Sequence, residues 1–230
     1  MTRARDLADA ADKDFSGTVT VDNITIGGNI SQDSGTVKLD GNFPTGTANV
    51  ALGNTTLDSL SGGGYNVGIG TQALTANTSG DANVGVGYGA LDANTSASYN
   101  VGIGYDALGV NTTGTANVAV GGQSLDANTT ASNNTAVGYQ ALTANTTGAE
   151  NTAIGKEAAK ANTTGSYNTA LGRTSFLTNT TGSSNVALGA NTLRSSTTAS
   201  NNTAVGYDSL RANTTGNSNV AVGTNSLDAN

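Results

Sequence analysis

Three aspartates at one position of a repeating sequence are the first candidates for chemistry. Asp58, Asp92 and Asp126 each lie two repeats from the next. Paired carboxylates hydrolyse glycosides when they stand roughly 5–9.5 Å apart. Stacked repeats at about 4.8 Å per layer would place these aspartates about 10 Å apart, and we expect no neighbouring group to change their proton affinity. We therefore expect a solvated polar column and no enzyme activity.

Other sequence motifs also match chemical patterns only superficially. The GxG fragments Gly85–Gly87 and Gly102–Gly104 occupy the same positions in two consecutive repeats, which indicates structural glycines and not a phosphate-binding loop. The N-T-T triplets match the acceptor for N-glycosylation, but their recurrence at one turn position favours a structural role. The chain has no Cys and no His, which excludes thiolate and imidazole metal ligands. We expect no catalytic residue, no cofactor and no metal.

Four tyrosines share one repeat position: Tyr88, Tyr105, Tyr139 and Tyr207. Stacking would place them in an exposed aromatic column. Aromatic faces pack against sugar rings, so the column is a candidate contact for a receptor glycan. Ordinary surface packing is the alternative.

Composition and charge narrow the class of protein. The 230 residues include 32 Gly, 4% aromatic and 11% charged residues, which is typical of a disordered polar tract or of a repeat protein with a thin core. The net charge of −7 disfavours nucleic acid and anionic membranes as partners. No apolar run reaches the ~20 residues of a membrane span. The start MTRARDLADAADKD has no apolar stretch behind its charges, so we do not expect Sec export.

An uninterrupted 17-residue repeat favours a repeat protein over a disordered polar tract. Asn begins each of eleven copies, and the fifth position of every copy is Gly. We call each copy a rung and number the rungs from 1, which begins at Asn49, to 11, which begins at Asn219. The other rungs begin at Asn66, Asn83, Asn100, Asn117, Asn134, Asn151, Asn168, Asn185 and Asn202. A loop tolerates insertions, whereas stacked coils must keep their phase for hydrogen bonds to meet.

The second to fourth positions of each rung predict a β-strand. The second is Val or Thr, the fourth is Val, Ile or Leu, and the third is only Ala or Gly. β-branched residues at a period of two favour a strand. Since no charged residue appears on either side, we expect burial on both faces, one against the core of the coil and the other against a second copy of the chain. Which face lies inside is left open.

The rest of the rung predicts a second core anchor and a turn. The ninth position is Leu except at Ala159 and Phe176, within either a short strand or a single helical turn. The twelfth is usually Asn, followed by Thr, Thr or Ser, and Gly or Ala, which is turn chemistry. Stacked Asn side chains would form a ladder. Representative structural positions are Asn66, Gly70, Leu74, Asn134, Gly138, Leu142, Asn202, Gly206 and Leu210. The expected fold is all-β, a parallel β-solenoid of eleven coils over 49–230.

Residues 1–48 differ in kind from the repeats. A charged, Ala-rich stretch predicts a short helix, and GTVTVDNITIGG and GTVKLDG alternate as short strands do. We expect an attachment or capping segment. The alternative is a disordered leader followed by a solenoid cap.

The repeats, such as NTAVGYQALTANTTG at 134–148, resemble those of phage tail-fibre proteins. NVAVG and NTAIG are similar, more loosely, to head repeats of YadA-like trimeric autotransporter adhesins, although the repeat here is a few residues longer. TRARDLADAAD resembles N-termini of structural proteins in tailed marine phages, cyanophages especially. The resemblance to the adhesin heads implies a homotrimeric left-handed parallel β-roll. The chain ends inside a repeat, so we expect either a longer natural protein or a partner that covers this end.

These observations lead to a non-enzymatic fibre on the surface of a phage particle. Residues 1–48 would dock on other virion proteins, the chain would pair with itself as a trimer, and the far end would meet a host surface glycan or protein. A fragment of an adhesin on the bacterial cell surface is the alternative. Ice binding by a Thr column at the thirteenth position is a third reading, disfavoured because adjacent Thr residues point to opposite faces when extended.

Overall fold

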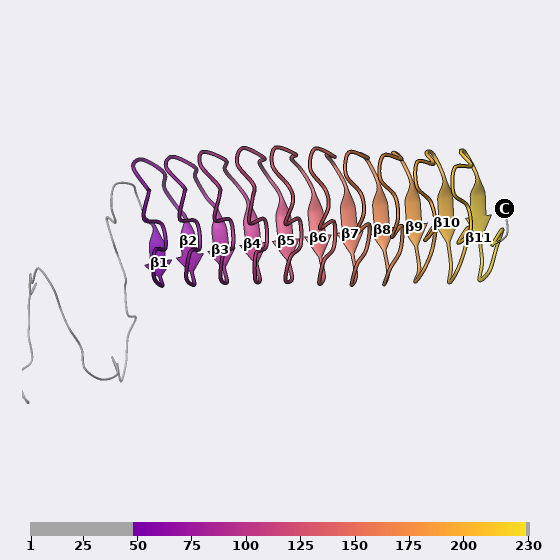
Figure 1. Ribbon diagram of the computed structural model, residues 1–230, viewed down its shortest axis with the longest axis horizontal. Helices are drawn as coiled ribbons and strands as arrows, with labels where there is room; N and C mark the ends of the chain where they lie inside the picture. Colours follow the sequence, from indigo (N-terminus) through magenta and orange to yellow (C-terminus); the bar gives the residue numbers. More distant parts are fainter. Residues whose placement is uncertain (1–47, 229–230) are drawn as a thin grey trace, which may run out of the picture. The chain divides into compact units, whose positions relative to one another are not determined.

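Residues 48–228 form one β-solenoid in the computed structural model, which describes this part of the chain. Figure 1 shows the rungs stacked in sequence order along one axis, each contributing one short strand. The strands are β1 (Val50–Leu52), β2 (Val67–Ile69), β3 (Val84–Val86), β4 (Val101–Ile103), β5 (Val118–Val120), β6 (Thr135–Val137), β7 (Thr152–Ile154), β8 (Thr169–Leu171), β9 (Val186–Leu188), β10 (Thr203–Val205) and β11 (Val220–Val222). The predicted attachment segment lies almost wholly outside the described residues.

The eleven strands form a single parallel sheet in which every neighbour is also the neighbour in sequence. The register follows the repeat, so that Val118 pairs with Thr135, Ala119 with Ala136 and Val120 with Val137. The predicted β-solenoid of 17-residue coils is therefore confirmed. The constant spacing agrees with this register, since one extra residue in a rung would shift its strand against the next one and turn that strand's side chains to the opposite face.

The small third residue of each strand faces the core. Ala119, Ala136 and Ala153 are fully buried and belong to one hydrophobic cluster with the ninth-position residues, among them Leu125 and Leu142. The larger second and fourth residues of the strand point away from this core and are partly exposed along the sheet. The structure thus answers the question that the sequence left open.

The ninth position lies in a turn, and neither a strand nor a helical turn forms there. Its residues adopt positive φ, for example 52° at Leu142 and 52° at Phe176, and the seventh position does the same. Positive φ is uncommon for Leu and Phe, so burial of the side chain holds the backbone there. The fifth-position Gly138 has a φ of 132°, and a Cβ at this site would stand 2.6 Å from the carbonyl oxygen of Gly155. Gly is required there both for the backbone angle and for the close approach of the next rung.

Two ladders of asparagine run through the interior. In the first, the backbone N–H of Asn134 donates to Oδ1 of Asn117 at 3.0 Å, and Nδ2 of Asn134 donates to the carbonyl of Gly148 at 3.0 Å. In the second, Nδ2 of Asn145 donates to Oδ1 of Asn128 at 3.2 Å and to the same carbonyl of Gly148 at 2.9 Å. The predicted ladder at the twelfth position is confirmed, and the first position adds another. Buried amides therefore satisfy one another from rung to rung.

Candidate interaction surfaces

The outer face of the sheet is an apolar stripe that follows the whole solenoid. We define the sheet stripe as the second and fourth positions of every strand, which carry only Val, Thr, Ile and Leu. Ile69 and Ile103 are 38% exposed, and Leu171 is 46% exposed. A strand face open to water normally admits charged residues. Neither column carries a charged residue in any of the eleven rungs, so the outer face of the sheet is an exposed stripe of Val, Ile, Leu and Thr side chains.

The Tyr column at the sixth position is discontinuous. The rings of Tyr88 and Tyr105, on adjacent rungs, stack with centroids 5.6 Å apart and planes 11° apart. Gly122 occupies the next rung, and Tyr139 and Tyr207 are separated by three rungs that carry other residues. All four tyrosines are at least half exposed. Side chains at this position on neighbouring rungs therefore lie side by side, but only one pair of tyrosines does so.

A second set of exposed tyrosines was missed in the sequence. Tyr65, Tyr99 and Tyr167 occupy the seventeenth position and are 65%, 68% and 60% exposed. Their signal was available, since Tyr recurs there in three rungs. They stand at least two rungs apart, so they form no continuous aromatic surface.

The aspartates Asp58, Asp92 and Asp126 of the tenth position stand two rungs apart, and the proton affinity of one of them is changed by its surroundings. Burial raises the pKa of Asp126, and the negative charge of Asp106 raises it further. We expected no neighbouring group to change the proton affinity of these aspartates. That expectation was wrong for Asp126, because Asp106 in the turn of the preceding rung lies near enough to act on it. The neighbouring carboxylate of Asp106 also raises the pKa of Tyr105. The other two, Asp58 and Asp92, remain two rungs from their nearest partner in the column.

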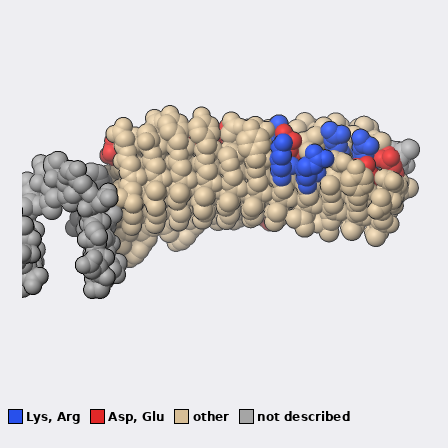
Figure 2. Space-filling view, turned by 90° about the horizontal axis from the view of Figure 1, so that it is seen from below, with Lys and Arg blue, Asp and Glu red and all other residues tan. Residues whose placement is uncertain are grey.

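Charge is distributed unevenly along the solenoid. Rungs 1 to 6 contain six acidic and no basic residues, whereas rungs 7 to 10 contain five basic and two acidic residues. Figure 2 shows the basic side chains gathered on one face over the second half of the described rungs. The basic residues are Lys156, Lys160, Arg173, Arg194 and Arg211.

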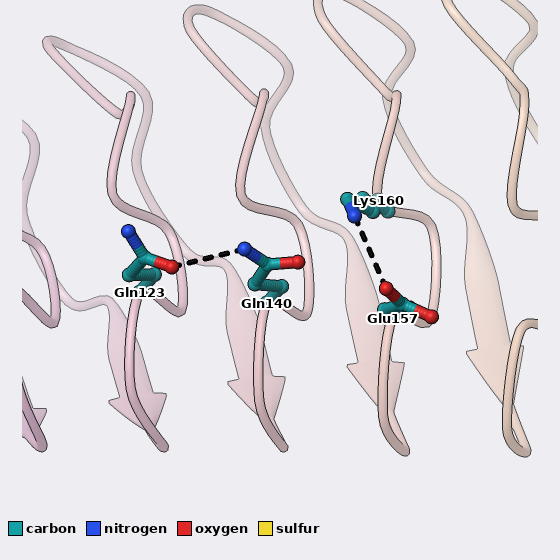
Figure 3. Close-up of polar contacts among 4 residues, drawn as sticks. All are labelled: Gln123, Gln140, Glu157 and Lys160. Atoms are coloured by element: carbon teal, nitrogen blue, oxygen red, sulfur yellow. Dashed lines mark hydrogen bonds and ion pairs between the residues drawn. The ribbon is translucent and has the colours of Figure 1, made fainter.

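Glu157 lies among three of these cations. Its Oε1 accepts a hydrogen bond from Nζ of Lys160 at 3.1 Å, as Figure 3 shows beside the neighbouring bond between Gln140 and Gln123. That bond lowers the pKa of Glu157, and the charges of Lys156 and Arg173 act in the same direction. A hollow of about 430 Å³ opens beside this pair, lined also by Ala144, Ala161 and Leu177 among others. One carboxylate thus meets three cations, which leaves net positive charge at this place.

The N-T-T triplets and the Thr column of the thirteenth position form hydrogen bonds between rungs. The triplet asparagines from Asn77 to Asn179 are fully buried, so their amides are closed to a modifying enzyme in the folded chain. The thirteenth-position hydroxyls donate to the carbonyl of the next rung, for example Thr163 to Thr180 at 2.9 Å. Because these hydroxyl hydrogens are engaged within the protein, the column does not favour ice binding.

Within residues 48–228 there is no group of three or more acidic, His or Cys side chains that would hold a metal ion. The same residues include no helix able to cross a membrane. Comparison with protein-family models, curated protein sequences and solved structures gives no match.

Proposed function

We propose that this chain is a structural fibre protein of a phage particle, a homotrimer in which the sheet stripes of three copies pack together. The exposed sheet stripe is the observation that carries the proposal. Each copy presents the same two apolar columns at the same spacing, so copies in parallel cover one another along their full length. The thin core of Ala and Leu leaves the larger Val, Ile and Leu side chains outside the coil, where association buries them.

The remaining parts of the proposal rest on the resemblance of the sequence. Three copies are chosen because the similar adhesin heads are trimers, and a virion location is chosen because the repeats and the N-terminus resemble phage structural proteins. Residues 1–48 would then dock on the particle, and the solenoid would project toward a host surface. Recovery of the native protein in a secreted or outer-membrane fraction would favour a bacterial adhesin instead.

Solution mass tests the self-association. Light scattering after size exclusion should give a mass near three times 22.5 kDa that survives dilution. Ile69→Lys with Ile103→Lys places two charges in the stripe and should yield monomers. The matched control, Ser79→Lys with Thr113→Lys, adds the same charge at exposed turn positions of the same rungs and should remain trimeric. A folded monomer in the native chain would contradict the proposal.

A further inference from the structure

The basic face of rungs 7 to 10 is the one positively charged region among the described rungs. Its five cations outweigh Glu157 and Asp208, which gives a net charge of +3, from five minus two, against −6 for rungs 1 to 6. Lys160 and Arg211 each pair with one acid, at 3.1 Å to Glu157 and 3.7 Å to Asp208. Lys156 and Arg173 form no ion pair within residues 48–228 and are exposed. Such a concentration of unneutralised charge on an acidic chain favours an anionic partner.

Two of these five cations lie in one line with aromatic side chains. The sixth positions of rungs 6 to 10 are Tyr139, Lys156, Arg173, Ala190 and Tyr207. The stack of Tyr88 on Tyr105 shows that side chains at this position lie next to one another on adjacent rungs. Tyr139 and Tyr207, 50% and 53% exposed, therefore stand at the two ends of a row whose centre is cationic.

We propose that this row, the basic track, binds a linear acidic polysaccharide. Lys156 and Arg173 would bind the carboxylates of successive sugars, Arg in the bidentate manner that its planar fork permits. Tyr139 and Tyr207 would pack against sugar rings, and the hollow beside Glu157 and Lys160, which lies next to the row, would take a substituent of a sugar. The straight line of rungs, about 4.8 Å apart, suits an extended chain of pyranose units.

A polysaccharide accounts for the surface better than a nucleic acid. Nucleic acid demands many phosphate contacts, whereas only rungs 7 to 10 contain basic residues and each of the other described rungs carries one acidic residue, which repels phosphate. A few sugars of a carboxylate-bearing polymer are enough to reach both cations of the row and the Tyr side chains at its ends. The proposal is independent of the trimer, because it uses the sixth-position turns and not the sheet stripe.

Binding of polygalacturonate to the full-length chain, with dextran as the neutral polymer, tests the basic track. The native protein should bind polygalacturonate and not dextran. Lys156→Gln with Arg173→Gln should weaken binding about tenfold or more, since each removes a charge-assisted hydrogen bond. Tyr139→Ala with Tyr207→Ala should weaken it several-fold even at high salt, while Tyr105→Ala, outside the track, should have no effect.

The matched control separates a site from a general effect of charge. Asn54→Asp with Thr71→Asp lowers the net charge by the same two units at the sixth positions of rungs 1 and 2. Thr71 is five rungs, about 24 Å, from Lys156, well beyond the Debye length of about 8 Å at physiological salt. Equal losses in the two charge variants would overturn the proposal. So would tighter binding of a short single-stranded DNA than of polygalacturonate. Light scattering on the same samples reports the trimer separately, so either proposal can fail alone.

Discussion

At the scale of single residues, the buried amides of asparagine determine the rung-to-rung contacts. Asn145 has no exposed surface and donates both amide hydrogens, to Asn128 and Gly148, while its Oδ1 accepts from Asn162 at 2.8 Å. An amide both donates and accepts, so each Asn can bond the rung before it and the rung after it. No other side chain of this size both donates and accepts hydrogen bonds in a fixed orientation.

Asn145→Asp should therefore be far more damaging than its size suggests. The carboxylate loses both donors and turns oxygen atoms toward the acceptors of Asn128 and Gly148. The loss of stability should reach about 3 kcal/mol or more at neutral pH, because a charge is buried among acceptors. Protonation restores one donor, so the deficit should shrink as the pH falls. Thermal unfolding at pH 7 and pH 4 measures both effects.

Thr147→Asp is the control for this experiment, because it adds the same charge to an exposed position of the same rung. Its effect should stay within about 0.5 kcal/mol, as for most surface substitutions. Equal destabilisation by the two variants would mean that charge alone, and not the ladder, is responsible.

Single-residue patterns in the sequence were enough to find the invariant Asn and Gly positions and the sixth-position tyrosines, but not the seventeenth-position tyrosines or the effect of one charged side chain on another. The invariant Gly of the fifth position was visible in the sequence, and the structure adds the reason for it, since Gly138 adopts a positive φ. The seventeenth-position tyrosines were visible in the sequence and were missed because they recur in only three rungs. The influence of Asp106 on Asp126 was not predictable, since it depends on how adjacent turns face each other.

At the scale of elements, the period-two pattern located the strands correctly while leaving their orientation undecided. Large β-branched residues ordinarily face the core of their own chain. Here the coil is too thin for them, and Ala119 and Leu125 fill it instead. Positive φ at Leu125 and its equivalents was equally unpredictable, because Leu has no preference for that backbone region. Residue propensity therefore identified the strand, whereas packing determined which of its faces lies against the core.

Packing between rungs 7 and 8 provides a test of this view of the core. Ala159 and Phe176 replace Leu at the ninth position of adjacent rungs, and both are buried in one cluster. The small residue and the large one together carry as many side-chain carbon atoms as two Leu residues, so the large ring can compensate for the small methyl group. Phe176→Leu alone should create a cavity and cost about 1–2 kcal/mol, and Ala159→Leu alone should overpack and cost about 1–3 kcal/mol.

The double variant Ala159→Leu with Phe176→Leu restores the pair found in other rungs and should approach native stability. Chemical denaturation of the four proteins gives the coupling energy directly, and we expect it to favour the double variant by more than about 1 kcal/mol. Additive losses would show that the two sites are independent and that each rung packs by itself.

At the scale of the whole molecule, each strand between Val50 and Val222 pairs only with the strands of the adjacent rungs. In such a one-dimensional array, stability is approximately a sum over rungs and their interfaces. Folding then requires that every rung keep the 17-residue period, whereas the number of rungs can vary. The sheet stripe and both Asn ladders continue through any number of rungs, provided the phase is kept.

Deletion of residues 134–150, one complete rung, should therefore give a folded and shorter solenoid. Rung 5 would meet rung 7 in register, with Val118 beside Thr152 and the ladder bond of Asn117 passing to Asn151. Circular dichroism per residue should match the native chain, and the unfolding midpoint should fall only slightly.

Deletion of residues 134–149 removes one residue fewer and leaves rung 5 with an extra residue before Asn151. That residue breaks both Asn ladders at the interface between rungs 5 and 7. The unfolding transition should therefore become less cooperative, and its midpoint should fall further than that of the first deletion. Equal stability of the two deletions would show that the phase of the repeat does not hold the rungs together.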